Sequence, residues 1–252
     1  MRSNYIEYCF LFENNIILCC IFMKGKTNVN KKNIIVFGYA GKMLVVNEIF
    51  TSIQGEGTRT GELCAFIRLS GCSFGCYYCD TKYANTETGK EYSVDELIEI
   101  VKGLGTNLVE ITGGEPLEQS ETPYFAEKLL ENGFEVLIET NGSENIGVLP
   151  EKVIKIVDVK LPWVVRKDYF LYENLQYLAK NDELKFVIDG VEGYNWAKNF
   201  IETHNIACKI IFSPCAQKFE PDILAQMIIK DKLNVRFGLQ IHKILWGDKR
   251  GV

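Results

Sequence analysis

From residue 43 onward, hydrophobic and polar positions follow two alternating periods. Short apolar runs rich in β-branched and aromatic residues predict strands, and apolar residues spaced three or four apart predict helices between them. The predicted strands are 64–70, 107–112, 134–140, 153–160, 183–189, 207–213 and 234–240. The predicted helices are 92–105, 122–133, 194–205 and 220–233. The helix at 92–105 has the clearest start, because Ser93 and Glu96 form a capping box.

Strands that alternate with helices at this spacing predict a parallel sheet with right-handed crossovers. About six strand–helix units are too few for a closed eightfold barrel. The sequence therefore predicts an α/β fold, a partial, open (βα)6-type barrel with mostly parallel strands. Chemistry in such folds gathers at the carboxyl ends of the strands. Three cysteines, Gly113–Pro116, Thr140–Asn141 and Lys160 all lie at or just after the ends of predicted strands.

Residues 1–42 differ from the rest of the chain. Their apolar run, 16–23, is far shorter than the roughly 20 residues of a membrane span. It is also a poor secretory signal, because acidic residues precede it and no small-residue cleavage site follows. We expect a leader or extension at 1–42, either disordered or adding one strand at 33–39, and a catalytic domain at 43–252 that starts at Met43.

Composition excludes several classes of protein. The 252 residues are 47% hydrophobic and carry a net charge of −5, so no global basic field indicates a nucleic acid or anionic membrane partner. Nine cysteines without the regular spacing of a disulfide scaffold favour a reducing, cytoplasmic compartment. The only histidines are His204 and His242, which rules out a histidine-rich metal site.

Cys72, Cys76 and Cys79 form a C-x3-C-x2-C cluster directly after the strand predicted at 64–70. Thiolates at this spacing favour a soft metal, either zinc or an iron–sulfur cluster. A structural zinc site normally has four protein ligands, and Cys208 and Cys215 are not spaced as a matching pair. A 4Fe–4S cluster with three cysteines leaves one iron open to another ligand. Spacing alone leaves both metals possible.

Tyr78 precedes the last cysteine, and this arrangement resembles the radical S-adenosylmethionine superfamily. The sequence "TGGEP" at 112–116 is similar to the GGE motif of that superfamily, although alone it is an ordinary turn. Together with "NEIFTSIQGEG" at 47–57, "YYCDT" at 77–81 and "QIHKILWGDKRGV" at 240–252, these motifs resemble the 7-carboxy-7-deazaguanine synthase family. The resemblance runs from about Val45 to the end of the sequence, with only the leader outside it.

The resemblance implies a lyase that contracts the ring of 6-carboxy-5,6,7,8-tetrahydropterin to 7-carboxy-7-deazaguanine, with loss of ammonia, in the biosynthesis of queuosine and other 7-deazapurines. It implies a 4Fe–4S cluster, S-adenosylmethionine and Mg²⁺ as cofactors. A 5′-deoxyadenosyl radical would take a hydrogen from C6 of the pterin and later return it. A flavodoxin or ferredoxin as reductant and a homodimer are also implied.

The resemblance also assigns residues to the site. Cys72, Cys76 and Cys79 would ligate the cluster, and Thr81 would ligate Mg²⁺. The substrate would contact Ile53, Gln54, Gly55, Glu56, Arg68, Thr112, His242 and Val252. S-adenosylmethionine would contact Tyr78, Cys79, Asp80, Gly114, Glu115, Asn141 and Lys160. No side chain is assigned as a direct acid or base, because the cofactor carries the radical chemistry.

Residue chemistry suits several of these roles. The Gln54 amide offers both a donor and an acceptor to a pterin edge, and Arg68 is a natural partner for a carboxylate. Magnesium keeps several waters, so one hydroxyl, from Thr81, is enough protein contact. Plainer roles remain for three residues: a helix N-cap for Thr81, a surface position for Lys160, and a core or surface position for His242.

Two other functions compete with this prediction. A glycyl-radical-enzyme activase shares the cysteine spacing and a small partial barrel, but has no reason to carry "SIQGEG" and "CDT" together. A non-enzymatic zinc or iron–sulfur binding module would share the cysteines without any S-adenosylmethionine cleavage. The motif set favours the ring-contracting enzyme.

Overall fold

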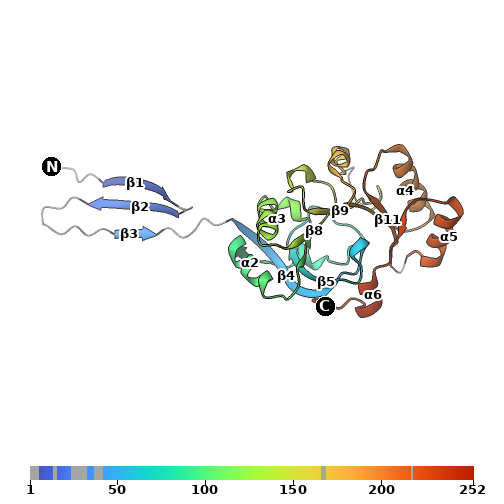
Figure 1. The fold of residues 1–252 in the computed structure, drawn as a ribbon, viewed down its shortest axis with the longest axis horizontal. Helices are drawn as coiled ribbons and strands as arrows, with labels where there is room; N and C mark the ends of the chain where they lie inside the picture. The colour runs from blue at the N-terminus through green and yellow to red at the C-terminus, as the bar shows by residue number, and fades with distance from the viewer. Residues whose placement is uncertain (1–5, 14–15, 24–32, 37–41, 166–168, 217) are drawn as a thin grey trace. The chain divides into compact units, whose positions relative to one another are not determined.

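The computed structural model describes residues 6–13, 16–23, 33–36, 42–165, 169–216 and 218–252. Its contacts divide the chain into two compact units, Met1–Lys42 and Met43–Val252. In the first unit, β1 (Ile6–Glu13), β2 (Ile16–Met23) and β3 (Asn33–Val36) form an antiparallel sheet (Figure 1). The strand predicted at 33–39 begins as β3, which pairs with β2, and residues 37–39 lie outside the described residues.

The second unit is built on one sheet of nine strands, in the order β12-β11-β10-β9-β8-β7-β5-β4-β6. The strands are β4 (Met43–Ile53), β5 (Leu63–Leu69), β6 (Lys90–Ser93), β7 (Leu108–Gly113), β8 (Glu135–Thr140), β9 (Ile154–Asp158), β10 (Glu183–Ile188), β11 (Lys209–Pro214) and β12 (Arg236–Phe237). From β5 to β12 neighbouring strands are parallel, and β4 is antiparallel to both β5 and β6. The predicted open, mostly parallel α/β fold is confirmed.

The predicted helices are present between these strands. The α-helices are α1 (Tyr83–Thr86), α2 (Val94–Lys102), α3 (Thr122–Glu131), α4 (Val191–Thr203), α5 (Pro221–Asp231) and α6 (Ile241–Trp246). Short 3₁₀ turns lie at η1 (Gly57–Arg59), η2 (Pro116–Glu118), η3 (Ile146–Val148) and η4 (Tyr172–Tyr177). The capping box of α2 is confirmed, because Ser93 and Glu96 exchange hydrogen bonds as predicted. No helix of the described residues is long and apolar enough to cross a membrane.

Three strands differ from the prediction. β4 and β6 were not predicted, because Asn47, Glu48 and other polar residues interrupt the apolar pattern that marks a strand. The strand predicted at 234–240 is only two residues long in β12. Gly238 follows β12 and its amide still donates to Phe212 O at 2.9 Å, so the chain leaves the sheet gradually.

The two faces of the curved sheet have different compositions because side chains alternate along each strand. The helices lie around the outer face of the sheet (Figure 1). Ile67 and Ile111 belong to the main core cluster, which also contains helix residues such as Leu97. On the inner face, Phe66, Leu137 and Ile156 form a small apolar cluster. Positions two residues further along these strands are charged, so the inner face changes from apolar to polar toward the carboxyl ends.

Candidate active site

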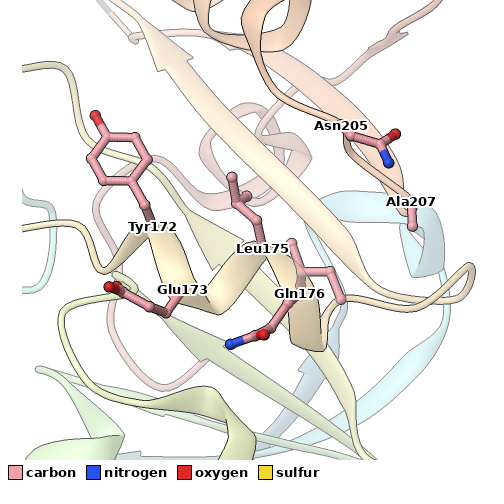
Figure 2. Close-up of a pocket in the computed structure, with 7 residues that line it drawn as sticks. Tyr172, Glu173, Leu175, Gln176, Asn205 and Ala207 are labelled. Carbon is pink, nitrogen blue, oxygen red and sulfur yellow. The ribbon is translucent and has the colours of Figure 1, made fainter.

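Two hollows among the described residues are candidates for the site. One, of about 640 Å³, lies over η4 and is lined by Tyr172, Glu173, Leu175, Gln176, Leu178, Asn205 and Ala207 (Figure 2). Most of these side chains are exposed, and no predicted site residue is among them. We therefore place the site in the other hollow.

The second hollow is a cavity of about 790 Å³ at the carboxyl ends of the strands, within the usual size range of ligand pockets. The structure brings almost every predicted site residue to its wall. These are Ile53, Gln54, Gly55, Glu56, Arg68, Cys72, Cys76, Tyr78, Cys79, Asp80, Thr81, Thr112, Gly114, Asn141, Lys160, His242 and Val252. Glu115 is the one predicted residue that does not line the cavity.

The cysteine loop connects β5 to α1. Its backbone is held by Gly71 N donating to Ala84 O at 2.9 Å and by Cys79 N donating to Cys76 O at 3.2 Å. The three cysteines are free thiols. Burial raises the pKa of Cys72 to about 11 and also raises the pKa of Cys76. A positively charged metal centre would favour the thiolate form of both.

The thiols of Cys72, Cys76 and Cys79 all line the same cavity. An iron–sulfur cluster takes one thiolate on each of several irons, and these three residues are the ones that the sequence pattern predicts for that role.

The loop after β7 lies directly against the cysteine loop. Glu115 N donates to Gly71 O at 2.8 Å, and Gly114 N donates to Leu69 O at 3.0 Å. A Cβ added to Gly114 would lie 1.8 Å from Gly71 O and 2.9 Å from Cys72 Cβ. Only glycine permits this approach, so the "GGE" glycine sets the position of the cysteine loop.

The Glu115 side chain turns away from the cavity. Its carboxylate accepts hydrogen bonds from Asn141 N at 2.7 Å, Thr140 Oγ1 at 2.7 Å and Leu117 N at 3.0 Å. Burial raises its pKa to about 7 against the effect of these donors. The carboxylate thus joins the ends of β7 and β8, while the contact with S-adenosylmethionine stays a prediction.

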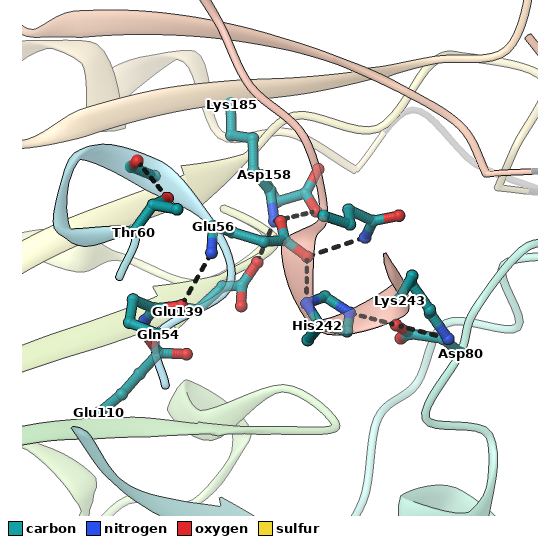
Figure 3. A network of polar contacts seen from close by, with 12 residues as sticks. Gln54, Glu56, Thr60, Asp80, Glu110, Glu139, Asp158, Lys185, His242 and Lys243 are labelled. Carbon is teal, nitrogen blue, oxygen red and sulfur yellow. Dashed lines mark hydrogen bonds and ion pairs between the residues drawn. The ribbon is translucent and has the colours of Figure 1, made fainter. Parts of the chain in front are cut away.

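A network of charged side chains fills the inner face of the sheet beside the cavity (Figure 3). Lys185 Nζ lies 2.8 Å from Glu56 Oε2 and 3.2 Å from Asp158 Oδ2, and it also donates to Glu139. Asp158 also pairs with Lys160 Nζ at 2.8 Å. Burial alone would lower the pKa of Lys185, but the carboxylates outweigh it and hold that pKa well above its usual value.

Gln54 and Glu56 are already engaged within this network (Figure 3). Gln54 Nε2 donates to Glu110, and Gln54 Oε1 accepts from Glu56 N at 3.0 Å. Glu56 Oε1 accepts from Gln240 Nε2 at 2.8 Å and lies 4.0 Å from His242 Nδ1. The Gln54 amide therefore positions the loop after β4 rather than pointing unpaired into the cavity.

Arg68 and Thr112 are register partners on β5 and β7. Arg68 Nε donates to Glu48 Oε2 at 3.1 Å, and its guanidinium lies 5.9 Å from the centre of the Tyr83 ring. Arg68 lines the cavity and Glu48 does not. The hydrogen bond to Glu48 therefore holds Arg68 from the side away from the cavity and fixes the direction of its guanidinium.

Tyr78, Asp80 and His242 also line the cavity. Asp80 Oδ2 lies 3.8 Å from His242 Nε2 and 3.5 Å from Lys243 Nζ. Burial would raise the pKa of Asp80, but these two partners hold it below its usual range. The Tyr78 hydroxyl is buried without a hydrogen-bond partner among the described residues. Such an orphaned group fits a polar ligand in the cavity.

Sequence comparisons agree with this geometry. The Radical SAM superfamily model matches residues 66–165. A 7-carboxy-7-deazaguanine synthase of Koribacter versatilis is 40% identical over 218 residues, which cover 80% of this chain and 96% of that protein. Its counterpart in Chlorobaculum tepidum is 41% identical over 216 residues, which cover 83% of this chain and 97% of that protein. This chain belongs to the 7-carboxy-7-deazaguanine synthase family.

Structure comparisons support the same family. The crystal structure of QueE from Escherichia coli matches with a TM-score of 0.67 and 26% identity, over 79% of this chain and 94% of that one. SuiB of Streptococcus suis, bound to its precursor peptide, matches with a TM-score of 0.51 and 16% identity, over 67% of this chain and 46% of that one, which shows the fold alone. The family predicted from the motifs is confirmed.

Sequence reasoning missed several residues of the candidate site of this 7-carboxy-7-deazaguanine synthase family member. Glu110, Glu139, Asp158 and Lys185 all line the cavity from the middle or end of parallel strands. Parallel strands covered on both faces are usually apolar throughout. A charged residue inside such a strand was therefore a usable signal, and each of the four strands carries at least one.

The buried carboxyl of Glu110 gives a prediction for the pH dependence of stability. Burial and the nearby Glu139 raise its pKa from 4.5 to about 8. Because the folded-state pKa is raised, the associated stability is complete below the unfolded pKa and is lost as pH rises toward about 8. We expect Glu110→Gln to flatten the fall in melting temperature between about pH 5 and pH 8.

Thermal unfolding of the protein without cofactors, followed by circular dichroism at several pH values, measures this effect. Glu127→Gln, which changes an exposed glutamate of α3, is the control and should keep the wild-type slope. An unchanged slope in Glu110→Gln would show that Glu110 is already ionised in the folded protein at low pH.

Proposed function

We propose that this chain converts 6-carboxy-5,6,7,8-tetrahydropterin to 7-carboxy-7-deazaguanine with loss of ammonia, as a radical S-adenosylmethionine lyase of queuosine biosynthesis. The main support is structural: the motifs at 47–57, 72–81, 112–116 and 240–252 come from distant parts of the chain but line or adjoin one cavity. The names of relatives that are covered almost completely by this chain support the same reaction.

The proposed cofactors fit the residues of the cavity. Cys72, Cys76 and Cys79 would hold a 4Fe–4S cluster, and the loop of Gly114 would lie beside S-adenosylmethionine. When bound, this pair supplies a one-electron reduction and a carbon-centred radical. The orphaned Tyr78 hydroxyl and the unpaired Asp158 Oδ1, both on buried parts of the wall, suit a polar ligand there.

The side chains of the cavity would orient the substrate rather than exchange protons with it. Arg68, held from behind by Glu48, offers N–H donors to a carboxylate or a ring oxygen. The charges of Glu56 and Lys185 are fixed by their mutual contact at 2.8 Å. We call these fixed charges the charge cage. Because its side chains are already held in place, they need not reorganise when a polar ring binds and reacts.

Thr81 is the proposed protein ligand of Mg²⁺. It is half-buried on the cavity wall, and its Oγ1 has one weak partner among the described residues, Cys79 Sγ at 3.6 Å. The hydroxyl lone pairs therefore fit a hard cation that takes its other ligands from water and the substrate carboxylate. The expected alternative, a helix N-cap, differs from the structure, since Lys82 occupies that position for α1.

The proposal includes two partners that the family resemblance implies. One is a flavodoxin or ferredoxin that reduces the cluster, and the other is a second copy of this chain in a homodimer. A cytoplasmic location suits both the free thiols described above and an oxygen-sensitive cluster.

One experiment tests the proposed function. The protein is reconstituted with iron and sulfide without oxygen, then incubated with the pterin, S-adenosylmethionine, Mg²⁺ and a reductant. We expect 7-carboxy-7-deazaguanine with little net loss of S-adenosylmethionine. Cleavage of S-adenosylmethionine without this product would instead favour a glycyl-radical activase, and failure to take up a cluster would favour a zinc module.

Thr81→Ala tests the magnesium site. Loss of one ligand is expected to raise the Mg²⁺ concentration for half-maximal activity roughly tenfold or more, while the visible spectrum of the cluster stays unchanged. Thr86→Ala removes an exposed hydroxyl of the same segment, which donates to Lys82 O, and should behave as wild type. A cluster spectrum lost together with activity would make Thr81 a structural residue.

A further inference from the structure

Arg250 makes an unusual set of contacts for a residue near the end of the described chain. Its Nη1 and Nη2 atoms donate to the two carboxylate oxygens of Glu87 at 2.8 and 2.9 Å. Its Nε donates to Glu48 Oε1 at 3.0 Å. Its guanidinium carbon lies 3.6 Å from the centre of the Tyr83 ring. The guanidinium thus uses its whole planar fork and one of its faces.

The segment 246–252 forms part of the cavity wall, since each of its residues lines the cavity. Apart from those of Arg250, few hydrogen bonds or ion pairs with other described residues hold it. Gly247 N donates to Lys243 O at 3.0 Å, Lys249 N donates to Trp246 O at 3.3 Å, and exposed Asp248 pairs with Lys243. All of these are local to the segment and α6. Arg250 is the residue that ties the segment to β4 and α1.

The same contacts reach the substrate side of the cavity. Glu48 Oε1 accepts from Arg250, while Glu48 Oε2 accepts from Arg68 Nε at 3.1 Å and from Tyr83 Oη at 2.9 Å. Glu48 itself does not line the cavity. One carboxylate behind the wall therefore couples the position of the 246–252 segment to the direction of Arg68.

We propose that Arg250 is a positioning residue that clasps the segment 246–252 over the cavity and, through Glu48, sets Arg68 for the substrate. The inference rests on the proposed function only for the identity of that substrate. Tyr83 and Glu87 lie just beyond Thr81, so the clasp also connects the segment to the end of the cysteine loop. With the clasp closed, the pterin meets a complete wall and a fixed guanidinium.

The clasp is partly exposed, since the Arg250 and Glu87 side chains are 42% and 47% exposed. Salt screens exposed ion pairs, so closure should weaken as ionic strength rises. We expect KM for the pterin to rise with salt in the wild type and to depend much less on salt in Arg250→Ala. At low salt, Arg250→Ala should raise KM about tenfold and change kcat less than about twofold.

Three variants and a control separate clasping from general structural damage. Arg250→Lys keeps the charge but loses the planar fork, so its KM should lie between wild type and Arg250→Ala. Glu87→Gln breaks the clasp from the other side and should raise KM in the same direction. Arg59→Ala is the control, because Arg59 pairs in the same way with Glu62 and Glu135 yet does not line the cavity.

Hydrogen–deuterium exchange of the peptide 241–252 gives a readout that needs no turnover. We expect faster exchange in Arg250→Ala and Glu87→Gln than in wild type or Arg59→Ala. If these two variants exchange faster than wild type but the wild type makes no product, the clasp stands and the proposed function fails. An active wild type whose Arg250→Ala variant shows unchanged exchange and KM, or loses only kcat, would overturn the clasp.

Discussion

Lys185→Met is expected to lower the free energy of unfolding by about 3–5 kcal/mol, the range seen when one partner of a buried ion cluster is removed. Lys185 is 3% exposed and its ammonium contacts Glu56, Glu139 and Asp158. Methionine fills a similar volume without a charge, so these carboxylates would repel one another in a buried site. The variant should also bind the proposed pterin poorly, because Glu56 loses the partner that fixes it.

The pH dependence of this loss has a definite sign. Glu56 and Asp158 have lowered pKa values, since Lys185 and other cationic partners outweigh the effect of burial. Stability from a lowered carboxyl pKa is present above the unfolded pKa and is lost as pH falls. The difference in stability between wild type and Lys185→Met should therefore shrink below about pH 5. A difference that grows as pH falls would contradict an ionised cluster.

Lys155→Met is a matched control. Lys155 is also buried on β9 and its Nζ lies 3.4 Å from Asp182, but it does not line the cavity. Asp182 keeps hydrogen bonds from Lys155 N and Ala179 N in the variant. We expect a smaller loss of stability, measured by urea unfolding, and an unchanged KM. An equal rise of KM in both variants would point to general damage rather than to loss of the charge cage.

The fold was predictable where local patterns agree with tertiary structure. The strand of Cys64–Ser70 and the helix capped by Ser93 carry both a clear period and clear ends, and the structure reproduces them within two or three residues. β4 was not predicted, because it is stabilised by pairing with β5 and β6 rather than by a local apolar pattern. Its polar residues, including Glu48, have partners that local sequence does not reveal.

The sequence predicted which residues line the cavity better than it predicted which of their side chains contact one another. Motif residues such as Cys76 and Asn141 were placed at one cavity by topology, because parallel strands end at one edge. His242 was placed there by the family resemblance alone. The contacts depend on residues far apart in sequence. Gln54 binds Glu110, and Glu56 binds Lys185, across separations of 56 and 129 positions. No local pattern encodes such pairs, although a charge inside an apolar strand marks where to look.

Gly114→Ala is expected to abolish cluster uptake and product formation. The added methyl group would lie 1.8 Å from Gly71 O and 2.4 Å from Gly71 C, well inside van der Waals contact with backbone that cannot rotate away. The main chain must move, and Glu115 N would lose its bond to Gly71 O. Overpacking of side chains usually costs about 1–3 kcal/mol, and a clash with fixed backbone should cost more. The displaced segment carries Cys72, the first proposed cluster ligand.

Gly75→Ala is the matched control, because it adds the same methyl group within the cysteine loop itself. A Cβ on Gly75 meets nothing within 4 Å, and Gly75 is not among the glycines with positive φ. Iron and sulfide content and visible absorbance after reconstitution compare the two variants. Gly75→Ala should bind the cluster as wild type does, whereas Gly114→Ala should bind little or none. If both variants take up a full cluster, the tight contact between the loops of Gly71 and Gly114 is not what positions the cysteines. If Gly114→Ala takes up a full cluster but makes no product, the glycine acts on S-adenosylmethionine instead.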